Sequence, residues 1–120
     1  MNSGDITYEI IGCAMQVHTT LGPGLPEKPY ENALAIELRE RGIGCAQQPS
    51  YPIVYRDEVV GNYVPDIMVQ ESVLVDVRSV DGIDPTEVGQ VLNYLRITGV
   101  GLGLVLNFKP VKLEIKRVSL

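Results

Sequence analysis

The 120-residue sequence has little of what marks several common protein classes. Its two cysteines, Cys13 and Cys45, lack the Cys-x-x-Cys spacing of many metal and redox sites, so buried free thiols are expected. Ten basic against fifteen acidic residues give a net charge of −5, which disfavours non-specific DNA binding. The apolar, uncharged run over residues 97–108 carries three glycines and is too short to span a bilayer. With no basic, apolar leader visible, we expect one cytoplasmic domain over residues 1–120.

What the sequence does have is an apolar composition. It is 45% hydrophobic and 21% charged, which is typical of a soluble globular domain that hides some apolar surface in an oligomer. We therefore expect a homodimer, formed through the N-terminal helix or an exposed sheet edge, and no membrane partner.

Helical periodicity predicts three helices. The first is capped by Ser3 or Asp5 and ends at residues 22–24, where glycine and proline follow one another. The second covers residues 26–41, with prolines tolerated in its first turn. The third covers residues 85–97. The charged residues of the second helix that are expected to face water are Glu31, Glu37, Arg39, Glu40 and Arg41.

Apolar alternation predicts strands over residues 45–48, 51–55, 59–69, 73–80, 101–107 and 113–120. The strands at 59–69 and 73–80 flank a short polar turn and are expected to pair as an antiparallel hairpin. The helix at 85–97 can then act as a crossover, which places the strand at 101–107 parallel to the one at 73–80. This order predicts an α/β or α+β fold around one mixed sheet.

Charged residues interrupt the apolar hairpin. Asp76 and Arg78 are two apart, so they point to the same face of the sheet, and Asp66 on the neighbouring strand can reach the same place. An acid inside an apolar strand costs several kcal/mol unless it is paired, hydrogen-bonded or metal-bound. These three charged residues therefore need a partner there, such as an ion pair, a hydrogen bond or a bound metal ion.

Residues 24–30, GLPEKPY, form a G-x-x-E-x-x-Y run. Further segments accompany it along the chain: VH before LGPG, YENALAIELRERG, YLRITG and the final LVLNF strand. This set resembles the motifs of the small GxxExxY proteins, a branch of the PD-(D/E)XK nuclease-like superfamily. Gln90-x-x-x-Tyr94 also resembles the extra motif of RecB-like exonucleases. The resemblance implies a restriction-endonuclease-like mixed β-sheet flanked by helices, with an extra N-terminal helix.

The resemblance also implies a phosphodiesterase-type site. Its members would be Glu27, Asp66, Asp76, Arg78, Gln90 and Tyr94. The three acids among them, Glu27, Asp66 and Asp76, would bind Mg²⁺ or Mn²⁺, for which hard oxygen ligands are suited. Nucleic acid is the partner that such a site implies, although the acidic balance of the chain argues against it.

The sequence departs from the E-x-K pattern of the superfamily at Asp76-Val77-Arg78. Aspartate in place of glutamate withdraws the carboxylate by roughly 1.5 Å. Arginine in place of lysine stays protonated at any working pH, which excludes Arg78 as a general base. Arg78 can instead hold a phosphate, or pair with Asp66, Asp76 or Glu27 and stand in for the metal.

Three functions remain open at this point. The departures favour a degenerate member with no or weak catalysis that acts as a binding or assembly module. The alternative is an active Mg²⁺-dependent nuclease that hydrolyses DNA or RNA. The third is an α/β domain whose acids are ordinary helix caps and strand-edge residues, which the occurrence of all motifs in family order disfavours.

Overall fold

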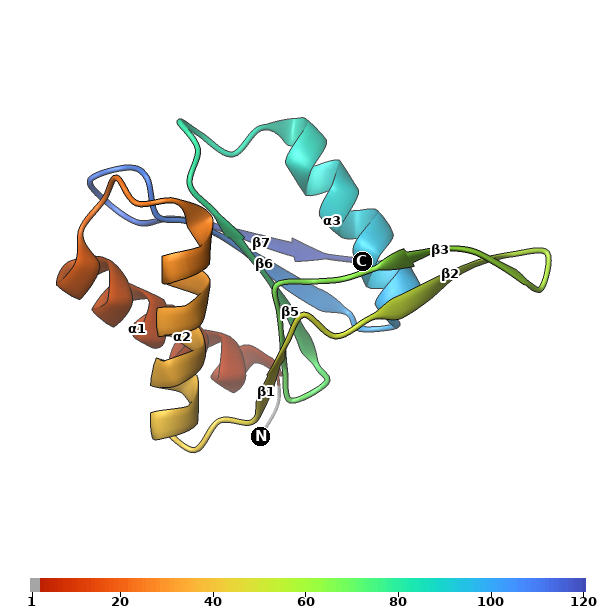
Figure 1. Cartoon of the computed structure of the whole chain (residues 1–120), viewed down its shortest axis with the longest axis horizontal. Coiled ribbons are helices and arrows are strands. Elements are labelled where there is room, and N and C mark those ends of the chain that lie inside the picture. The colour runs from red at the N-terminus through yellow and green to blue at the C-terminus, as the bar shows by residue number, and fades with distance from the viewer. Residues whose placement is uncertain (1–2) are drawn as a thin grey trace.

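The computed structural model describes residues 3–120, with side chains from Ile6 onward. Its helices and strands are, in chain order, α1 (Ser3–Leu21), α2 (Glu27–Glu40), β1 (Cys45–Gln47), β2 (Tyr51–Tyr55), β3 (Glu58–Tyr63), β4 (Ile67–Val69), β5 (Val73–Arg78), α3 (Pro85–Thr98), β6 (Leu102–Asn107) and β7 (Glu114–Ser119). Figure 1 shows α1 and α2 on one face of the central strands and α3 on the other. The predicted helices are confirmed, whereas capping by Ser3 or Asp5 lies outside the described side chains. None of the helices within residues 3–120 has the length and apolarity to cross a bilayer.

The central sheet has five strands in the order β1-β4-β5-β6-β7. Antiparallel pairs join β1 to β4, β4 to β5 and β6 to β7, whereas β5 and β6 run parallel. A parallel neighbour needs a crossover connection, and α3 supplies it between β5 and β6. The predicted mixed sheet flanked by helices is confirmed, and so is the parallel pairing of these two strands.

The side chains of β5 alternate between the two helical layers. Val75 and Val77 pack in the core under α1 and α2, whereas Leu74 packs in the core under α3. Asp76 and Arg78 have the same parity as Leu74, so they lie on the face that α3 covers. Their common face agrees with the alternation predicted from the sequence.

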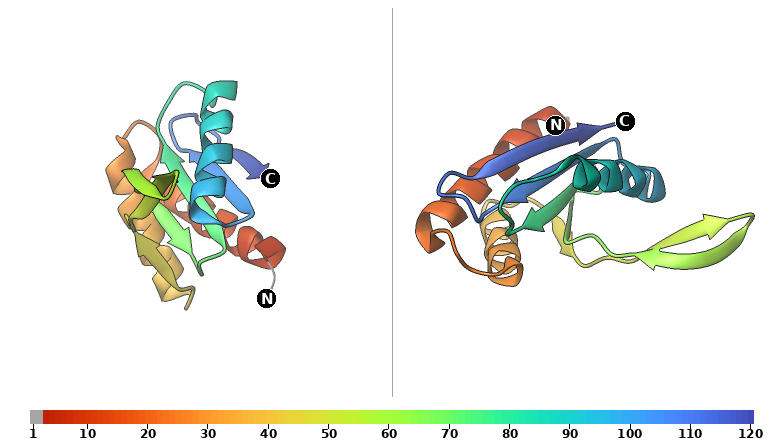
Figure 2. Two further views of the ribbon diagram at one scale, coloured as in Figure 1. Left: turned by 90° about the vertical axis from the view of Figure 1, so that its right-hand side faces the viewer. Right: turned by 90° about the horizontal axis from the view of Figure 1, so that it is seen from above.

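The predicted strand over residues 59–69 is wrong as a single element. Its first part is β3, which pairs with β2 in a separate two-stranded sheet, and its last part is β4 of the central sheet. Pro65 lies between the two parts, and a proline has no N–H to donate to a sheet. Figure 2 shows the β2–β3 hairpin reaching away from the rest of the molecule. Asp66 consequently stands just before a short central strand.

Helix α3 begins and ends at the residues that its sequence predicts. Asp84 Oδ1 accepts the N–H of Glu87 at 3.0 Å, and Pro85 occupies the first turn. Gly99 ends the helix with a φ of 78°, and its N–H donates to Leu95 O at 2.9 Å. This fixed start places Glu87 in the first turn, where an acid suits the helix dipole.

Gly103 on β6 lies under α3, and its substitution gives a stability prediction. A Cβ at this position would lie 2.9 Å from Cγ1 of the buried Val91. Because valine is branched and cannot turn away easily, Gly103→Ala should lower the free energy of unfolding by about 1–3 kcal/mol. Urea unfolding measures this, and Gly101→Ala, whose Cβ would meet open space, is the matched control. Equal stability of the two variants would contradict the tight packing of α3 on β6.

Candidate functional site

Two aspartates face each other beside the β4–β5 ladder. The antiparallel register pairs Ile67 with Val75, so one further step sets Asp66 opposite Asp76. Opposed residues on neighbouring strands have Cβ atoms about 5 Å apart. The two carboxyl groups are close enough for each to shift the pKa of the other, and Asp66 Oδ2 accepts the backbone N–H of Val77 at 2.8 Å. The hairpin therefore brings these two acids together, as the sequence predicts.

The aspartate pair carries more negative charge than its surroundings neutralise. Burial and the neighbouring Asp66 carboxyl raise the pKa of Asp76 to about 7, which Arg78 offsets only in part. Burial also raises the pKa of Asp66, although the N–H of Val77 opposes this shift. Among the described residues, no salt bridge reaches either aspartate. Near neutral pH the pair therefore shares a proton, as adjacent carboxyl groups without a bound cation do.

The guanidinium of Arg78 contacts two glutamates instead. Its Nη2 lies 3.3 Å from Glu87 Oε1, and its Nε lies 3.9 Å from Glu27 Oε2. The Glu87 side chain is 16% exposed and the Glu27 side chain is 45% exposed. One contact is therefore sheltered and the other is open to water. Of the partners that the sequence suggests for Arg78, Glu27 is the one that it meets.

Glu27 reaches this place because the loop before α2 is anchored to the core. Tyr30 is fully buried, and its hydroxyl donates to Gly22 O at 2.6 Å and accepts the N–H of Leu25 at 3.0 Å. Ser79, directly after β5, donates its N–H to Glu27 Oε2 at 3.3 Å and its hydroxyl to Leu25 O at 2.7 Å. In the G-x-x-E-x-x-Y run, the tyrosine thus orders the loop and the glutamate bridges to β5.

The buried Asn107 of β6 fixes the segment that follows β5. Its side-chain amide accepts the N–H of Val80 at 3.0 Å and donates both to Val80 O and to Glu114 Oε1 at 2.9 Å. Glu114 Oε1 also accepts the N–H of Ile83 at 3.2 Å. Because Arg78 lies opposite Asn107 in the parallel ladder, this network holds the carboxyl end of β5 in place.

Glu31 is buried, so the prediction that it faces water is wrong. It is 3% exposed, and its carboxylate accepts hydrogen bonds from Lys28 Nζ at 3.1 Å, Gln47 Nε2 at 2.7 Å and Gln48 Nε2 at 3.1 Å. These donors offset the cost of burying the charge. The negative charge of Glu31 contributes to the raised pKa of Asp66. Its position four residues after the motif glutamate, on the same helix face, is the signal that could have revealed it.

Two tyrosines stack beside the aspartates. The rings of Tyr63 and Tyr94 have centroids 3.9 Å apart and planes within 10° of each other. Burial raises the pKa of Tyr63 far above its usual range, and the charge of Asp76 raises it further. Tyr94 therefore contacts Tyr63, the tyrosine whose pKa Asp76 influences, whereas Gln90, one turn earlier on α3, is exposed to solvent.

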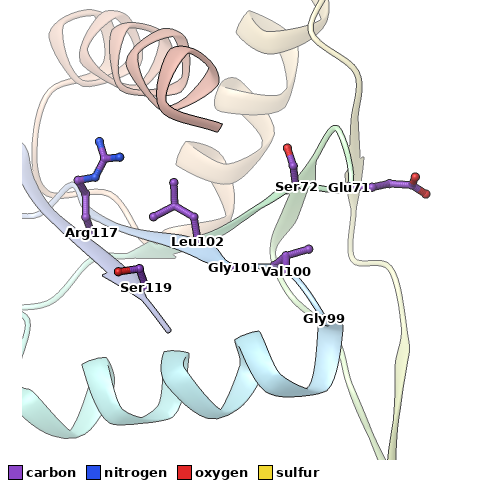
Figure 3. A pocket seen from close by; sticks show the side chains of 8 residues that line it. All are labelled: Glu71, Ser72, Gly99, Val100, Gly101, Leu102, Arg117 and Ser119. Carbon is purple, nitrogen blue, oxygen red and sulfur yellow. The ribbon is translucent and has the colours of Figure 1, made fainter. Parts of the chain in front are cut away.

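A hollow of about 650 Å³ lies at the opposite end of the central strands. Figure 3 shows the residues that line it, which are Glu71, Ser72, Gly99, Val100, Gly101, Leu102, Arg117 and Ser119. β5 and β6 begin at this end, whereas Asp76 and Arg78 lie near the other end of β5. None of the predicted site residues lines the hollow, so the candidate site is the aspartate pair with its surroundings.

Comparison with known proteins gives this arrangement a family. A model of the PD-(D/E)XK nuclease superfamily matches residues 4–118. The chain belongs to this superfamily. No curated protein matches the chain, and no solved structure does. The match covers both strands of the aspartate pair, and the assignment of the superfamily motif to Asp66 and Asp76-Val77-Arg78 stays a prediction.

Within residues 3–120, Ser79, Glu87 and Tyr63 also contact residues of the predicted site, and the sequence does not single them out. Glu87 is visible in the sequence only as an acid in the first turn of a helix, and its contact with Arg78 depends on how α3 packs on the sheet. Tyr63 is three residues before Asp66, but the break between β3 and β4 at Pro65 decides which way it faces. Ser79 follows Arg78 directly and contributes mainly its backbone N–H, which no sequence pattern reveals.

Nucleases of the PD-(D/E)XK superfamily typically use divalent metal ions, and part of the donor set of this chain fits one. Asp66 and Asp76 offer hard oxygen donors with unneutralised charge, and Mg²⁺ is usually held by one or two carboxylates with water completing its shell. In the described part of the chain, no three His, Cys, Asp or Glu side chains are grouped to hold a metal. Glu27, the predicted third ligand, lies beside Arg78, so the three-carboxylate site stays a prediction.

Proposed function

We propose that the chain is a metal-dependent phosphodiesterase that hydrolyses nucleic acid, with Mg²⁺ or Mn²⁺ held by Asp66 and Asp76. The observation that carries this proposal is the opposed carboxyl pair, which has no salt bridge within the described residues. Two like charges side by side in a partly buried place destabilise a fold unless a proton or a cation joins them. Carboxyl groups perturbed in this way cluster at functional sites.

The reaction is the attack of water on a phosphodiester, which breaks one P–O bond and gives a phosphomonoester and an alcohol. A bound Mg²⁺ or Mn²⁺ supplies neutralisation of the phosphate and a more acidic water. Arg78 stays protonated, so its role is to hold a phosphate oxygen and not to accept a proton. Because the aspartate pair must lose its shared proton before it binds an ion, binding should strengthen as the pH rises through about 7.

Cleavage by variants of the pair tests this function. The purified protein is incubated with plasmid DNA and with single-stranded RNA in Mn²⁺, and the products are separated by electrophoresis. Asp66→Asn and Asp76→Asn should each reduce cleavage by at least about a hundredfold, because each removes one of the two charged oxygen ligands proposed for the metal. Asp81→Asn, an exposed aspartate, is the control that keeps the activity. Undiminished cleavage by both site variants would overturn the proposal.

The second candidate is the function that the sequence alone favours, a degenerate member that binds or assembles without catalysis. The placement of Arg78 between Glu27 and Glu87 favours it, because this arginine is already occupied by carboxylates of its own chain. Calorimetric titration with Mn²⁺ separates the candidates. Heat of binding that disappears in Asp76→Asn supports the hydrolase, and absence of binding in the parent protein supports the degenerate member.

Self-association stays a prediction. Exposed apolar side chains gather on the β2–β3 hairpin, which projects from the rest of the molecule: Val54, Tyr55, Val59 and Val60. A two-stranded hairpin on its own is marginally stable in water, and an apolar patch of this kind is typical of surfaces that another protein covers. A homodimer therefore remains compatible with the distribution of apolar residues.

A further inference from the structure

Arg78 is held by two carboxylates of unequal freedom. Glu87 belongs to the first turn of α3, and its side chain is largely sheltered, whereas the Glu27 side chain is nearly half exposed at the start of α2. Among the described residues, Arg78 Nε and Glu87 Oε2 are buried without a hydrogen-bond partner. At 3.9 Å, the contact between Arg78 Nε and Glu27 is longer than a hydrogen bond. The guanidinium therefore has donor capacity left on the side of Glu27.

Glu27 also lies beside the aspartate pair. Its Oε2 accepts the N–H of Ser79, and Asp66 Oδ2 accepts the N–H of Val77, two residues earlier along the same strand direction, so the two carboxylates are neighbours beside β5. Its anchor on β5 is the N–H of Ser79, which comes three residues after Asp76. A side chain at this position can turn between the guanidinium on one side and the aspartates on the other, because it is open to water and its backbone is fixed by the start of α2.

We propose that Glu27 is an exchangeable internal anion that links phosphate binding to metal binding. In the free protein its carboxylate occupies Arg78. A phosphate of the nucleic acid takes this place on the guanidinium, and the displaced carboxylate turns to Asp66 and Asp76 and becomes the third oxygen ligand of the metal. This inference rests on the proposed function.

The exchange has a measurable consequence. If phosphate releases Glu27 toward the aspartates, phosphate and metal each strengthen the binding of the other by the same factor. If Glu27 loses its charge, Arg78 no longer has an internal competitor, and the third ligand is lost. A variant without this charge should therefore bind phosphate better without metal and gain less from the metal.

Fluorescence anisotropy of a labelled, phosphorothioate-linked single-stranded oligonucleotide tests this consequence. For the parent protein, saturating Mn²⁺ should tighten binding about tenfold relative to EDTA. Glu27→Gln should bind a few times more tightly than the parent in EDTA and gain less than about twofold from Mn²⁺. The partly exposed position of Glu27 makes this isosteric change compatible with folding, which circular dichroism checks.

Glu40→Gln is the matched control, since it removes the same charge from the exposed far end of the same helix. It should keep the tenfold gain of the parent, which separates the exchange from a general effect of net charge. The Asp66→Asn/Asp76→Asn double variant reports the effect of Mn²⁺ bound by the oligonucleotide alone.

Two results would overturn the exchange while leaving the proposed function intact. One is a Mn²⁺ gain in Glu27→Gln equal to that of the parent, and the other is Mn²⁺ binding by the parent, seen in calorimetry, without any gain in oligonucleotide affinity. Absence of Mn²⁺ binding by the parent in calorimetry overturns the proposed function itself, and the exchange with it. The exchange is supported if Glu27→Gln binds the oligonucleotide more tightly than the parent in EDTA but gains less affinity from Mn²⁺.

Discussion

Asp76→Asn should unfold about 10 °C above the parent protein in EDTA at pH 8. At this pH the parent holds two opposed, partly buried carboxylates without a bound cation, and the substitution removes one of the charges. The asparagine amide can donate to the remaining carboxylate of Asp66. We estimate a gain of about 2–3 kcal/mol, which corresponds to roughly 4 °C per kcal/mol for a domain of this size. Melting curves followed by circular dichroism measure the difference.

The pH dependence of the parent follows from the same pair. The pKa of Asp76 is about 7 in the folded protein against 3.8 for an ordinary aspartate, so between these values the folded state binds a proton that the unfolded chain does not. The corresponding stability is fully present below about pH 4 and is lost as the pH rises through about 7. The largest contribution that this pKa difference can make to the free energy of unfolding is about 4 kcal/mol. The Asp76→Asn variant should lack this loss.

Added Mg²⁺ provides the complementary measurement. An ion that binds only the folded state raises its stability, so the parent should gain stability at pH 8 and Asp76→Asn should not. Asp81→Asn controls for the charge change, because Asp81 is exposed and its carboxylate pairs with Lys109 and with neither aspartate. A variant Asp76→Asn that melts below the parent in EDTA would mean that Arg78 compensates Asp76 in the folded protein, and would favour the degenerate member.

Much of the fold could be predicted because neighbouring residues decide it. Asp84 and Gly99 set the ends of α3 by local capping, and the length of the segment between β5 and β6 requires a crossover. The strand over residues 59–69 could not be placed from its apolar pattern, since Val59 and Val69 serve two different sheets. Pro65 is the signal for the break, although the β-branched residues around it favour one continuous strand.

The site could be predicted where the backbone alone sets the geometry. Side-chain alternation and the register of the hairpin bring Asp66, Asp76 and Arg78 to one face of the sheet. The sequence reveals the alternation and the hairpin, so it also reveals this common face. The partners of Arg78 and the burial of Glu31 depend on how helices pack on the sheet. Glu87 reaches Arg78 from α3, and Glu31 accepts hydrogen bonds from two glutamines at the end of β1, Gln47 and Gln48. Such contacts join segments far apart in the chain, so no local pattern encodes them.

Tyr30→Ala should lower the free energy of unfolding by about 3–5 kcal/mol, and Tyr30→Phe by about 2 kcal/mol. The ring is fully buried and stacked on Phe108 with centroids 4.6 Å apart, so the alanine variant loses the packing and leaves a cavity. The phenylalanine variant keeps the ring but leaves the carbonyl of Gly22 and the N–H of Leu25 without their hydroxyl partner. Denaturant unfolding at pH 6 measures both losses.

Tyr55→Phe is the matched control for the hydroxyl, because Tyr55 is 61% exposed on the β2–β3 hairpin. It should be as stable as the parent. In Tyr30→Phe the loss should be local to the loop before α2, since this loop carries Leu25, whose carbonyl accepts the hydroxyl of Ser79. Hydrogen exchange at the Leu25 amide should therefore accelerate more than exchange in β5. Unchanged exchange at Leu25 would mean that the tyrosine of the motif serves the core alone, and that the position of Glu27 is set by α2 and Ser79 without it.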